Sequence, residues 1–236
     1  MKIVIVGAGR AGLEVATHLT RIGHAVTIID SDEAVTRRAS QQHGLVALSG
    51  DATIAAVLEE ADISQSDVVV AMLRRDADNL AVALLARAAG VERVMVRMRD
   101  NAYRPVYTAA GIDRVLSETD LITGSIATAI EHDAIRHAML LGDGGAIAFE
   151  LTIPEASAVA GQTIMELAAH KGFPASCVFA ALYQVDGSVE APRGSSIVQV
   201  GTTVLLVSRV DEVARAVKTL TDPAESSVSA TARQRS

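Results

Sequence analysis

Residues 2–12 read KIVIVGAGRAG, a short apolar run followed by Gly7, Gly9 and Gly12. In a strand–turn–helix unit, the first two glycines let the backbone turn tightly and approach a pyrophosphate at a helix N-terminus. The third glycine lets the helix pack closely against the strand. This stretch therefore predicts a strand, a phosphate-binding turn and a helix that begins near Arg10.

An acidic residue at the end of the next apolar run supports this interpretation. Residues 26–29 (VTII) lead to Asp30, eighteen positions after Gly12. A carboxylate at that place can accept hydrogen bonds from ribose hydroxyls, and its charge disfavours a 2′-phosphate. The two motifs together predict a nucleotide site that prefers NAD(H) or ATP/ADP to NADP(H).

The composition limits the class of protein. The chain has 236 residues, half of them apolar, with a formal net charge of -7 and no long basic block, so we expect no nucleic-acid partner. Its single cysteine, Cys177, cannot form an internal disulfide or build a zinc site alone, which indicates a reducing compartment. We see no signal-peptide pattern and no apolar stretch long enough to span a bilayer. We therefore expect a cytoplasmic protein that reaches the membrane only through a partner.

Strand-like and helix-like segments alternate along the first half of the chain, as right-handed βαβ units require. Asp32 and Thr53 are expected to be N-caps of two of the helices. The predicted fold class is α/β, a Rossmann-like, doubly wound parallel sheet. The expected strands are residues 2–6, 25–29, 45–48, 67–72, 93–98 and 114–116.

A longer helix is expected from Asp120 to about Leu141, because Ile122, Ile126 and Ile130 recur every four residues. The glycine-rich residues 142–145 then break the chain, and we place the domain boundary there. The predicted organisation is a nucleotide-binding domain with a dimerisation helix, a small α+β domain and a disordered tail. These parts cover residues 1–141, 145–221 and 222–236.

Charged residues near the carboxyl ends of the expected strands are further candidates. Arg10 would either reach a terminal phosphate or be solvated at the helix start. Asp51 follows the third strand, either beside an adenine or in a simple turn. Arg97 and Arg99 alternate with apolar neighbours, so either they point to opposite faces or the fifth strand has already ended. We expect only Arg97 to reach a phosphate. Glu118 would be a surface carboxylate or part of a cation site.

The motifs that usually mark catalysis are missing from the sequence. There is no Gly-x-Ser-x-Gly turn, no local Cys–His pairing and no pair of histidines at helical spacing. We therefore expect no catalytic residue, and a small NAD-dependent oxidoreductase is the weaker hypothesis.

Several segments together resemble the TrkA/KtrA family, whose modules are also called RCK or KTN domains. Residues 7–12, Asp30, residues 50–53 (GDAT) and residues 76–79 (DADN) resemble the N-terminal module. Residues 153–167 and 200–207 are similar to the RCK C-terminal module. The resemblance covers roughly residues 1–220.

This resemblance implies a cytosolic, non-enzymatic regulatory subunit of a bacterial potassium uptake system. Members of the family bind NAD(H), ATP or ADP, form homodimers and often larger rings, and lie beneath a TrkH/KtrB-type membrane subunit. An RCK-type regulator of another cation transporter is the alternative within the family. Motif matching implies a cation near Glu118 at a dimer interface. It implies that the nucleotide is held by Gly7, Ala8, Gly9, Arg10, Ala11, Gly12, Asp30, Asp51, Ala52, Met72, Leu73, Arg74 and Arg97.

Overall fold

The computed structural model describes residues 1–112, 114–142 and 144–223. Contacts between residues divide the chain into a first unit, Met1–Thr119, and a second unit that begins at Asp120. The division falls inside a helix, α6 (Glu118–Glu131). It therefore comes earlier in the chain than the glycine-rich boundary that the sequence suggests.

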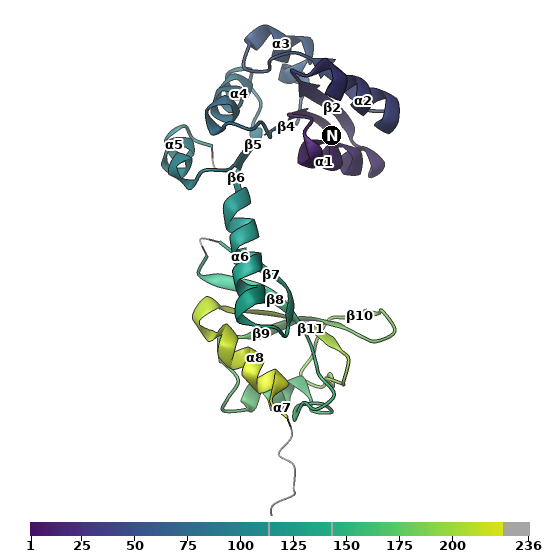
Figure 1. Cartoon of the computed structure of the whole chain (residues 1–236), viewed down its shortest axis with the longest axis vertical. Helices are drawn as coiled ribbons and strands as arrows, with labels where there is room; N and C mark the ends of the chain where they lie inside the picture. Colours follow the sequence, from purple (N-terminus) through teal and green to yellow (C-terminus); the bar gives the residue numbers. More distant parts are fainter. Residues whose placement is uncertain (113, 143, 224–236) are drawn as a thin grey trace, which may run out of the picture. The chain divides into compact units, whose positions relative to one another are not determined.

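In the described part of the first unit, six parallel strands form one sheet in the order β3-β2-β1-β4-β5-β6 (Figure 1). Ile5 of β1 pairs with Ile28 of β2 on one side and with Val70 of β4 on the other. The strand order reverses between β1 and β4, as in a doubly wound fold, so the predicted fold class is confirmed. The bounds are β1 (Lys2–Val6), β2 (Ala25–Asp30), β3 (Val46–Ser49), β4 (Val68–Ala71), β5 (Arg93–Met98) and β6 (Arg114–Ser117).

Strand β1 shows why these strands are almost continuously apolar. Ile3 and Ile5 lie in one buried cluster, and Val4 and Val6 lie in another. Successive side chains of a strand point to opposite faces, so β1 contributes to a core on each side of the sheet. One core includes residues of α1 (Arg10–Arg21) and α2 (Glu33–His43). The other includes residues of α3 (Ala55–Glu60), α4 (Asp76–Ala88) and α5 (Arg104–Ala109).

The two expected N-caps have different outcomes. The Asp32 carboxylate accepts a hydrogen bond from the backbone N–H of Ala34 at 2.8 Å and caps α2, as predicted. The prediction for Thr53 is wrong, because α3 begins later and has Ile54 at its N-cap. The Thr53 hydroxyl instead donates to the Asp51 carboxylate at 2.7 Å.

The described part of the second unit contains a five-stranded antiparallel sheet in the order β10-β9-β11-β8-β7. Phe149, Leu151 and Leu206 on one face of this sheet are buried with Leu167 of α7 and Leu220 of α8. An α+β architecture is therefore confirmed here. The bounds are β7 (Ile135–Leu141), β8 (Ala146–Thr152), α7 (Ile164–Ala169), β9 (Val178–Tyr183), β10 (Val189–Glu190), β11 (Thr203–Arg209) and α8 (Val213–Thr221).

The expected helix over residues 120–141 is wrong in its second half. Helix α6 ends at Glu131, and β7 then pairs with β8, with Leu140 opposite Ile147. Gly124 of α6 lies against this strand, since a Cβ there would be 2.6 Å from the Leu140 side chain. Helix α6 therefore packs on the strand that follows it, which explains why most of the helix belongs to the second unit.

The end of the described chain also differs from the prediction. The sequence predicts a disordered tail from residue 222, but the Asp222 carbonyl accepts the backbone N–H of Ala158 at 2.9 Å and Pro223 bridges to Ser157. Both residues are thus part of the second unit. Residues 224–236, the rest of that expected tail, lie outside the described residues. Among the helices that the structure describes, none has both the length and the apolar composition needed to cross a bilayer.

Candidate functional site

The glycine turn lies at the carboxyl end of β1, beside the loop that follows β4. Gly7 has a φ of +105°, and a Cβ there would lie 2.8 Å from the Met72 carbonyl oxygen. A Cβ on Gly12 would lie 1.9 Å from the Gly7 carbonyl oxygen. Packing within the protein thus requires glycine at both positions.

Gly9 differs from the other two glycines. A Cβ at Gly9 would meet no atom within 4 Å, so the protein itself does not require glycine there. Gly9 is the N-cap of α1, and the first turn of this helix has neither a side-chain cap nor an acidic residue. The first turn of α1 thus presents backbone N–H groups without a side-chain cap and the positive end of the helix dipole, which suits a phosphate group.

Asp30 connects the end of β2 to this turn. One carboxylate oxygen accepts the backbone N–H of Ala8 at 2.7 Å, and the other accepts the backbone N–H of Asp32 at 3.0 Å. Each oxygen keeps a lone pair, because a carboxylate can accept about four hydrogen bonds. The predicted role of Asp30 toward a ribose is compatible with this geometry and stays a prediction.

The loop after β3 places Asp51 and Ala52 differently. Asp51 is exposed, and its hydrogen bonds from the Thr53 hydroxyl and backbone N–H lower the pKa of its carboxyl. The Ala52 side chain is 3% exposed and belongs to a core of the first unit. Asp51 is thus accessible as a carboxylate, whereas Ala52 could contact a ligand only through its backbone.

The loop after β4 is held by a residue to which the sequence alone assigned no role. Asn79, fully buried in α4, accepts the backbone N–H of Leu73 at 2.7 Å and donates to the Leu73 carbonyl at 3.1 Å. The same amide donates to the Arg97 carbonyl at 3.0 Å. Asn79 thereby joins the ends of β4 and β5. The helix begins with several polar residues, so the sequence gives no signal that singles out Asn79.

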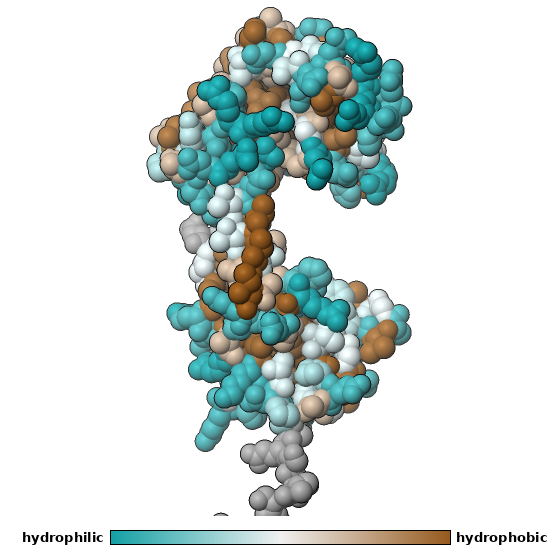
Figure 2. Space-filling view, viewed as in Figure 1, coloured by the Kyte–Doolittle hydropathy of each residue, from teal (hydrophilic) through white to brown (hydrophobic). Residues whose placement is uncertain are grey.

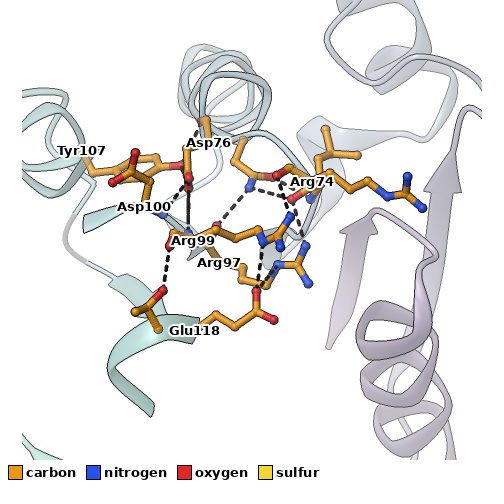
Figure 3. A network of polar contacts seen from close by, with 10 residues as sticks. Arg74, Asp76, Arg97, Arg99, Asp100, Tyr107 and Glu118 are labelled. Carbon is orange, nitrogen blue, oxygen red and sulfur yellow. Dashed lines mark hydrogen bonds and ion pairs between the residues drawn. The ribbon is translucent and has the colours of Figure 1, made fainter. Parts of the chain in front are cut away.

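Asp76 holds the turn after β5 in the same way (Figure 3). Its carboxylate is 7% exposed and accepts the backbone N–H groups of Arg99 at 3.1 Å and Asp100 at 3.0 Å. The Tyr107 hydroxyl donates to the Asp76 carbonyl at 2.9 Å, and burial together with the Asp76 charge raises the pKa of Tyr107. This buried carboxylate therefore fixes the backbone at Arg99 and Asp100.

The structure supports the second alternative for Arg97 and Arg99, because the strand ends before Arg99 and the two side chains converge. The Nε atoms of Arg97 and Arg99 lie 3.8 Å and 3.4 Å from the same oxygen, Glu118 Oε2 (Figure 3). Strand β5 ends at Met98, and the turn that follows directs Arg99 back toward Arg97. Both arginines are therefore available at one place.

Two arginines surround Glu118 within the chain. Its ion-pair partners are two guanidinium groups, and the described residues contain no group of three or more His, Cys, Asp or Glu side chains that could hold a metal. The cation that the resemblance implies at Glu118, at a dimer interface, stays a prediction.

The remaining candidates from the sequence lie on the same edge of the sheet. Arg10, Ala11 and Arg74 are exposed, whereas Ala8 is buried and Met72 and Leu73 are half-buried. The structure thus brings the loops after β1, β2, β3, β4 and β5 to the carboxyl end of the parallel sheet. In open α/β sheets this edge is where ligands bind.

Comparisons with known proteins match this architecture. A family model described as the TrkA-N domain matches residues 3–118. A Trk system potassium uptake protein TrkA homolog of Methanothermobacter thermautotrophicus is 28% identical over 221 residues, which cover 94% of this chain and 100% of that protein. A protein of the same description from Archaeoglobus fulgidus is 30% identical over 217 residues, which cover 90% of this chain and 48% of that protein. This chain therefore spans the first relative fully and about half of the second.

A solved structure described as the GsuK channel bound to NAD has a similar fold. It matches 95% of this chain and 40% of its own chain with a TM-score of 0.65 and 17% sequence identity. At this identity the similarity concerns the fold alone.

Proposed function

Because the chain belongs to the TrkA family, we propose that it is a nucleotide-binding regulatory subunit of a Trk/Ktr-type potassium uptake system. The observation that carries the proposal is the glycine turn with Asp30 bonded to it, inside the segment that the TrkA-N domain model matches. Gly9 leaves the N-terminus of α1 open to a phosphate. This arrangement offers binding groups and no recognisable catalytic set, which favours regulation over catalysis.

The ligand we propose is NAD(H) or ATP/ADP. Asp30 disfavours a 2′-phosphate through its charge, so NADP(H) should bind more weakly. The GsuK channel, which shares the fold, was solved with NAD, and this supports NAD(H) as one candidate. The glycine turn would hold the phosphates, and Asp30 the adenosine ribose.

We propose that copies of the chain pair through α6. Ile122, Ile126 and Ile130 are 51%, 54% and 75% exposed and form an apolar stripe along this helix (Figure 2). Burying three such side chains in a partner would contribute several kcal/mol, at about 1.5–3 kcal/mol each. The resulting homodimer, or a larger ring built from it, would act on a TrkH/KtrB-type membrane subunit.

Regulation by a nucleotide requires that the ligand bind two states of this assembly with different affinities. The proposed subunit has both parts of such a device, a ligand site in the first unit and an apolar helix for assembly. The chain itself would remain on the cytoplasmic side and reach the membrane through the pore subunit.

Two measurements test this function. Calorimetry with NAD, NADH, ATP, ADP and NADP should give saturable binding of the first four ligands and weaker binding of NADP. Purification of the tagged full chain from native membranes should recover a potassium-translocating subunit. Failure of every nucleotide to bind would contradict the proposed ligand. Recovery of a pore for another cation would contradict the proposed potassium partner.

A further inference from the structure

A buried amide lies near the start of α4. Asn79 is fully buried, and the next residues on this face of the helix, Val82, Ala83 and Ala86, belong to an apolar core. Burying an amide without hydrogen bonds is costly, so its partners show what it holds. Because no part of Asn79 is exposed, it cannot touch a ligand at the sheet edge. Any role in binding must therefore act through other residues.

The hydrogen bonds of Asn79 use both kinds of group that an amide offers. Its Oδ1 accepts the backbone N–H of Leu73 at 2.7 Å, and its Nδ2 donates to the carbonyls of Leu73 at 3.1 Å and Arg97 at 3.0 Å. An ionised carboxylate could not donate to the two carbonyls, and an aliphatic side chain could form none of these bonds. The three partners together therefore require an amide.

Asn79 continues the backbone pairing beyond the end of β4. The Met72 N–H, just after the strand, donates to the Val6 carbonyl at 2.7 Å. Leu73 follows, and its N–H and carbonyl are both bonded to the Asn79 side chain. The amide thus fixes the peptide at which the chain leaves the sheet and turns toward α4.

This peptide is the wall against which Gly7 packs. A Cβ on Gly7 would lie 2.8 Å from the Met72 carbonyl oxygen and 3.2 Å from the Leu73 nitrogen. Gly7 has a φ of +105°, a conformation that the absence of a side chain permits. The position of Leu73 therefore limits where the glycine turn can begin.

The opposite side of the turn is held by Asp30, whose carboxylate accepts the Ala8 N–H at 2.7 Å. The turn thus lies between a carboxylate of β2 and an amide of α4, and both act on backbone groups. Groups that bind a ligand have to be held within about 0.5 Å of their best positions, and supporting hydrogen bonds do this. Asn79 supplies such support from inside the protein.

We propose that Asn79 is a positioning residue of the nucleotide site, which holds Leu73 against Gly7 and so keeps the glycine turn in the shape that receives phosphates. This inference rests on the proposed function and deepens it, because it assigns affinity to a residue that does not contact the ligand. The turn is common to every ligand with a diphosphate. The effect of Asn79 is therefore equal for NAD, ADP and ATP.

Calorimetry on the full chain, well below the melting temperature of each variant, tests this role. Asn79→Ala should bind ADP, ATP and NAD about tenfold more weakly than the wild type, by the same factor for each. Asn79→Ser keeps a smaller polar side chain and leaves a smaller cavity, but its hydroxyl cannot replace all three bonds. It should also bind the three ligands more weakly, and it serves where Asn79→Ala does not fold.

Val82→Ala is the matched control. Val82 is fully buried on the same face of α4, and its truncation leaves a cavity but does not change the bonds at Leu73. The melting temperature of Val82→Ala should fall, whereas its affinity for the three nucleotides should equal that of the wild type. If Asn79 acted on stability alone, Asn79→Ala would behave in the same way.

Hydrogen exchange measures the contact without a ligand. The Leu73 amide should exchange slowly in the wild type, because Asn79 accepts its hydrogen bond. In Asn79→Ala this amide should exchange about tenfold faster or more, and in Val82→Ala it should exchange more slowly than in Asn79→Ala.

Four results would overturn the positioning role. They are an unprotected Leu73 amide in the wild type, a wild-type affinity in the folded Asn79 variants, a loss confined to one nucleotide, and an equal loss in Val82→Ala. In each case nucleotide binding by the wild type would leave the proposed function standing. If the wild type binds none of the three nucleotides, the proposed function fails and the positioning role falls with it.

Discussion

The carboxylate of Asp30 is bonded to the backbone N–H of Ala8 across 2.7 Å, so the end of β2 holds the turn that follows β1. Its second oxygen accepts the N–H of Asp32. One side chain therefore organises two backbone segments in addition to its proposed contact with a ribose. An asparagine cannot replace it fully, because its NH₂ group would face one of these two N–H donors.

We predict that Asp30→Ala lowers the affinity for ADP or NAD about tenfold or more. The change removes the ribose acceptor and also the bond that shapes the glycine turn. Calorimetry on the folded variant measures the effect. Asp67→Ala is a matched control, since Asp67 accepts the N–H of Lys2 at 2.7 Å near the start of β4. Equal losses in the two variants would argue against a specific role for Asp30.

The glycines of the turn should separate stability from binding. Gly9→Ala is expected to change the free energy of unfolding by less than about 1 kcal/mol, because its Cβ meets no atom and only the N-cap preference changes. The same variant should lose most nucleotide binding, since the methyl group occupies the space that we assign to a phosphate.

Gly12→Ala, unlike Gly9→Ala, is expected to destabilise the fold. Its Cβ would lie 1.9 Å from the Gly7 carbonyl oxygen, and the resulting backbone shift should lower the free energy of unfolding by about 3 kcal/mol or more. Urea denaturation and calorimetry on both variants check the pair. If the Gly9→Ala protein binds nucleotide normally, the assignment of a phosphate to the space beside Gly9 is wrong.

Ile126→Asp should weaken pairing of the chain. Ile126 is 54% exposed, so the substitution should not disturb the fold, but it places a charge in the centre of the proposed apolar contact. We expect the dimer dissociation constant to rise about tenfold or more, measured by light scattering over a range of concentrations. Ala127→Asp adds the same charge to an exposed position beside the stripe and should have little effect. An unchanged mass for Ile126→Asp would exclude α6 as the interface.

The stability of the second unit should depend on alkaline pH through Cys177. Burial raises the pKa of its thiol from 9.0 to about 11. The unfolded chain therefore loses the thiol proton first, and the free energy of unfolding should fall by about 2 kcal/mol between pH 9 and pH 11. Urea denaturation across this range should show a smaller fall for Cys177→Ala. Identical pH profiles would show that the thiol has the same pKa in both states.

Local patterns were sufficient for most of the first unit. The apolar run 3–6 is buried on both faces, the glycine spacing matches the turn, and the Asp32 side chain caps the helix that follows it. Each of these features depends on residues that are close in the sequence. The handedness of the crossovers then limits the strand orders that are possible without choosing one.

The errors concern contacts between residues far apart in the chain. Residues 135–141 are apolar enough to continue a helix, and only their pairing with β8 makes them a strand. The sequence leaves open how Arg97 and Arg99 point, and their convergence on Glu118 likewise depends on Asp76, whose bonds to the turn after β5 link residues 23 and 24 positions apart. No window of sequence contains both partners of these contacts.

The position of β7 has a practical consequence for dissecting the protein. The glycine-rich stretch after Leu141 looks like a natural place to cut, but β7 is the edge strand that covers β8. A fragment starting at Ala146 would leave one side of β8 with unpaired backbone groups, a template for aggregation. A fragment meant to fold as the second unit alone has to start upstream of α6, at or before Glu118.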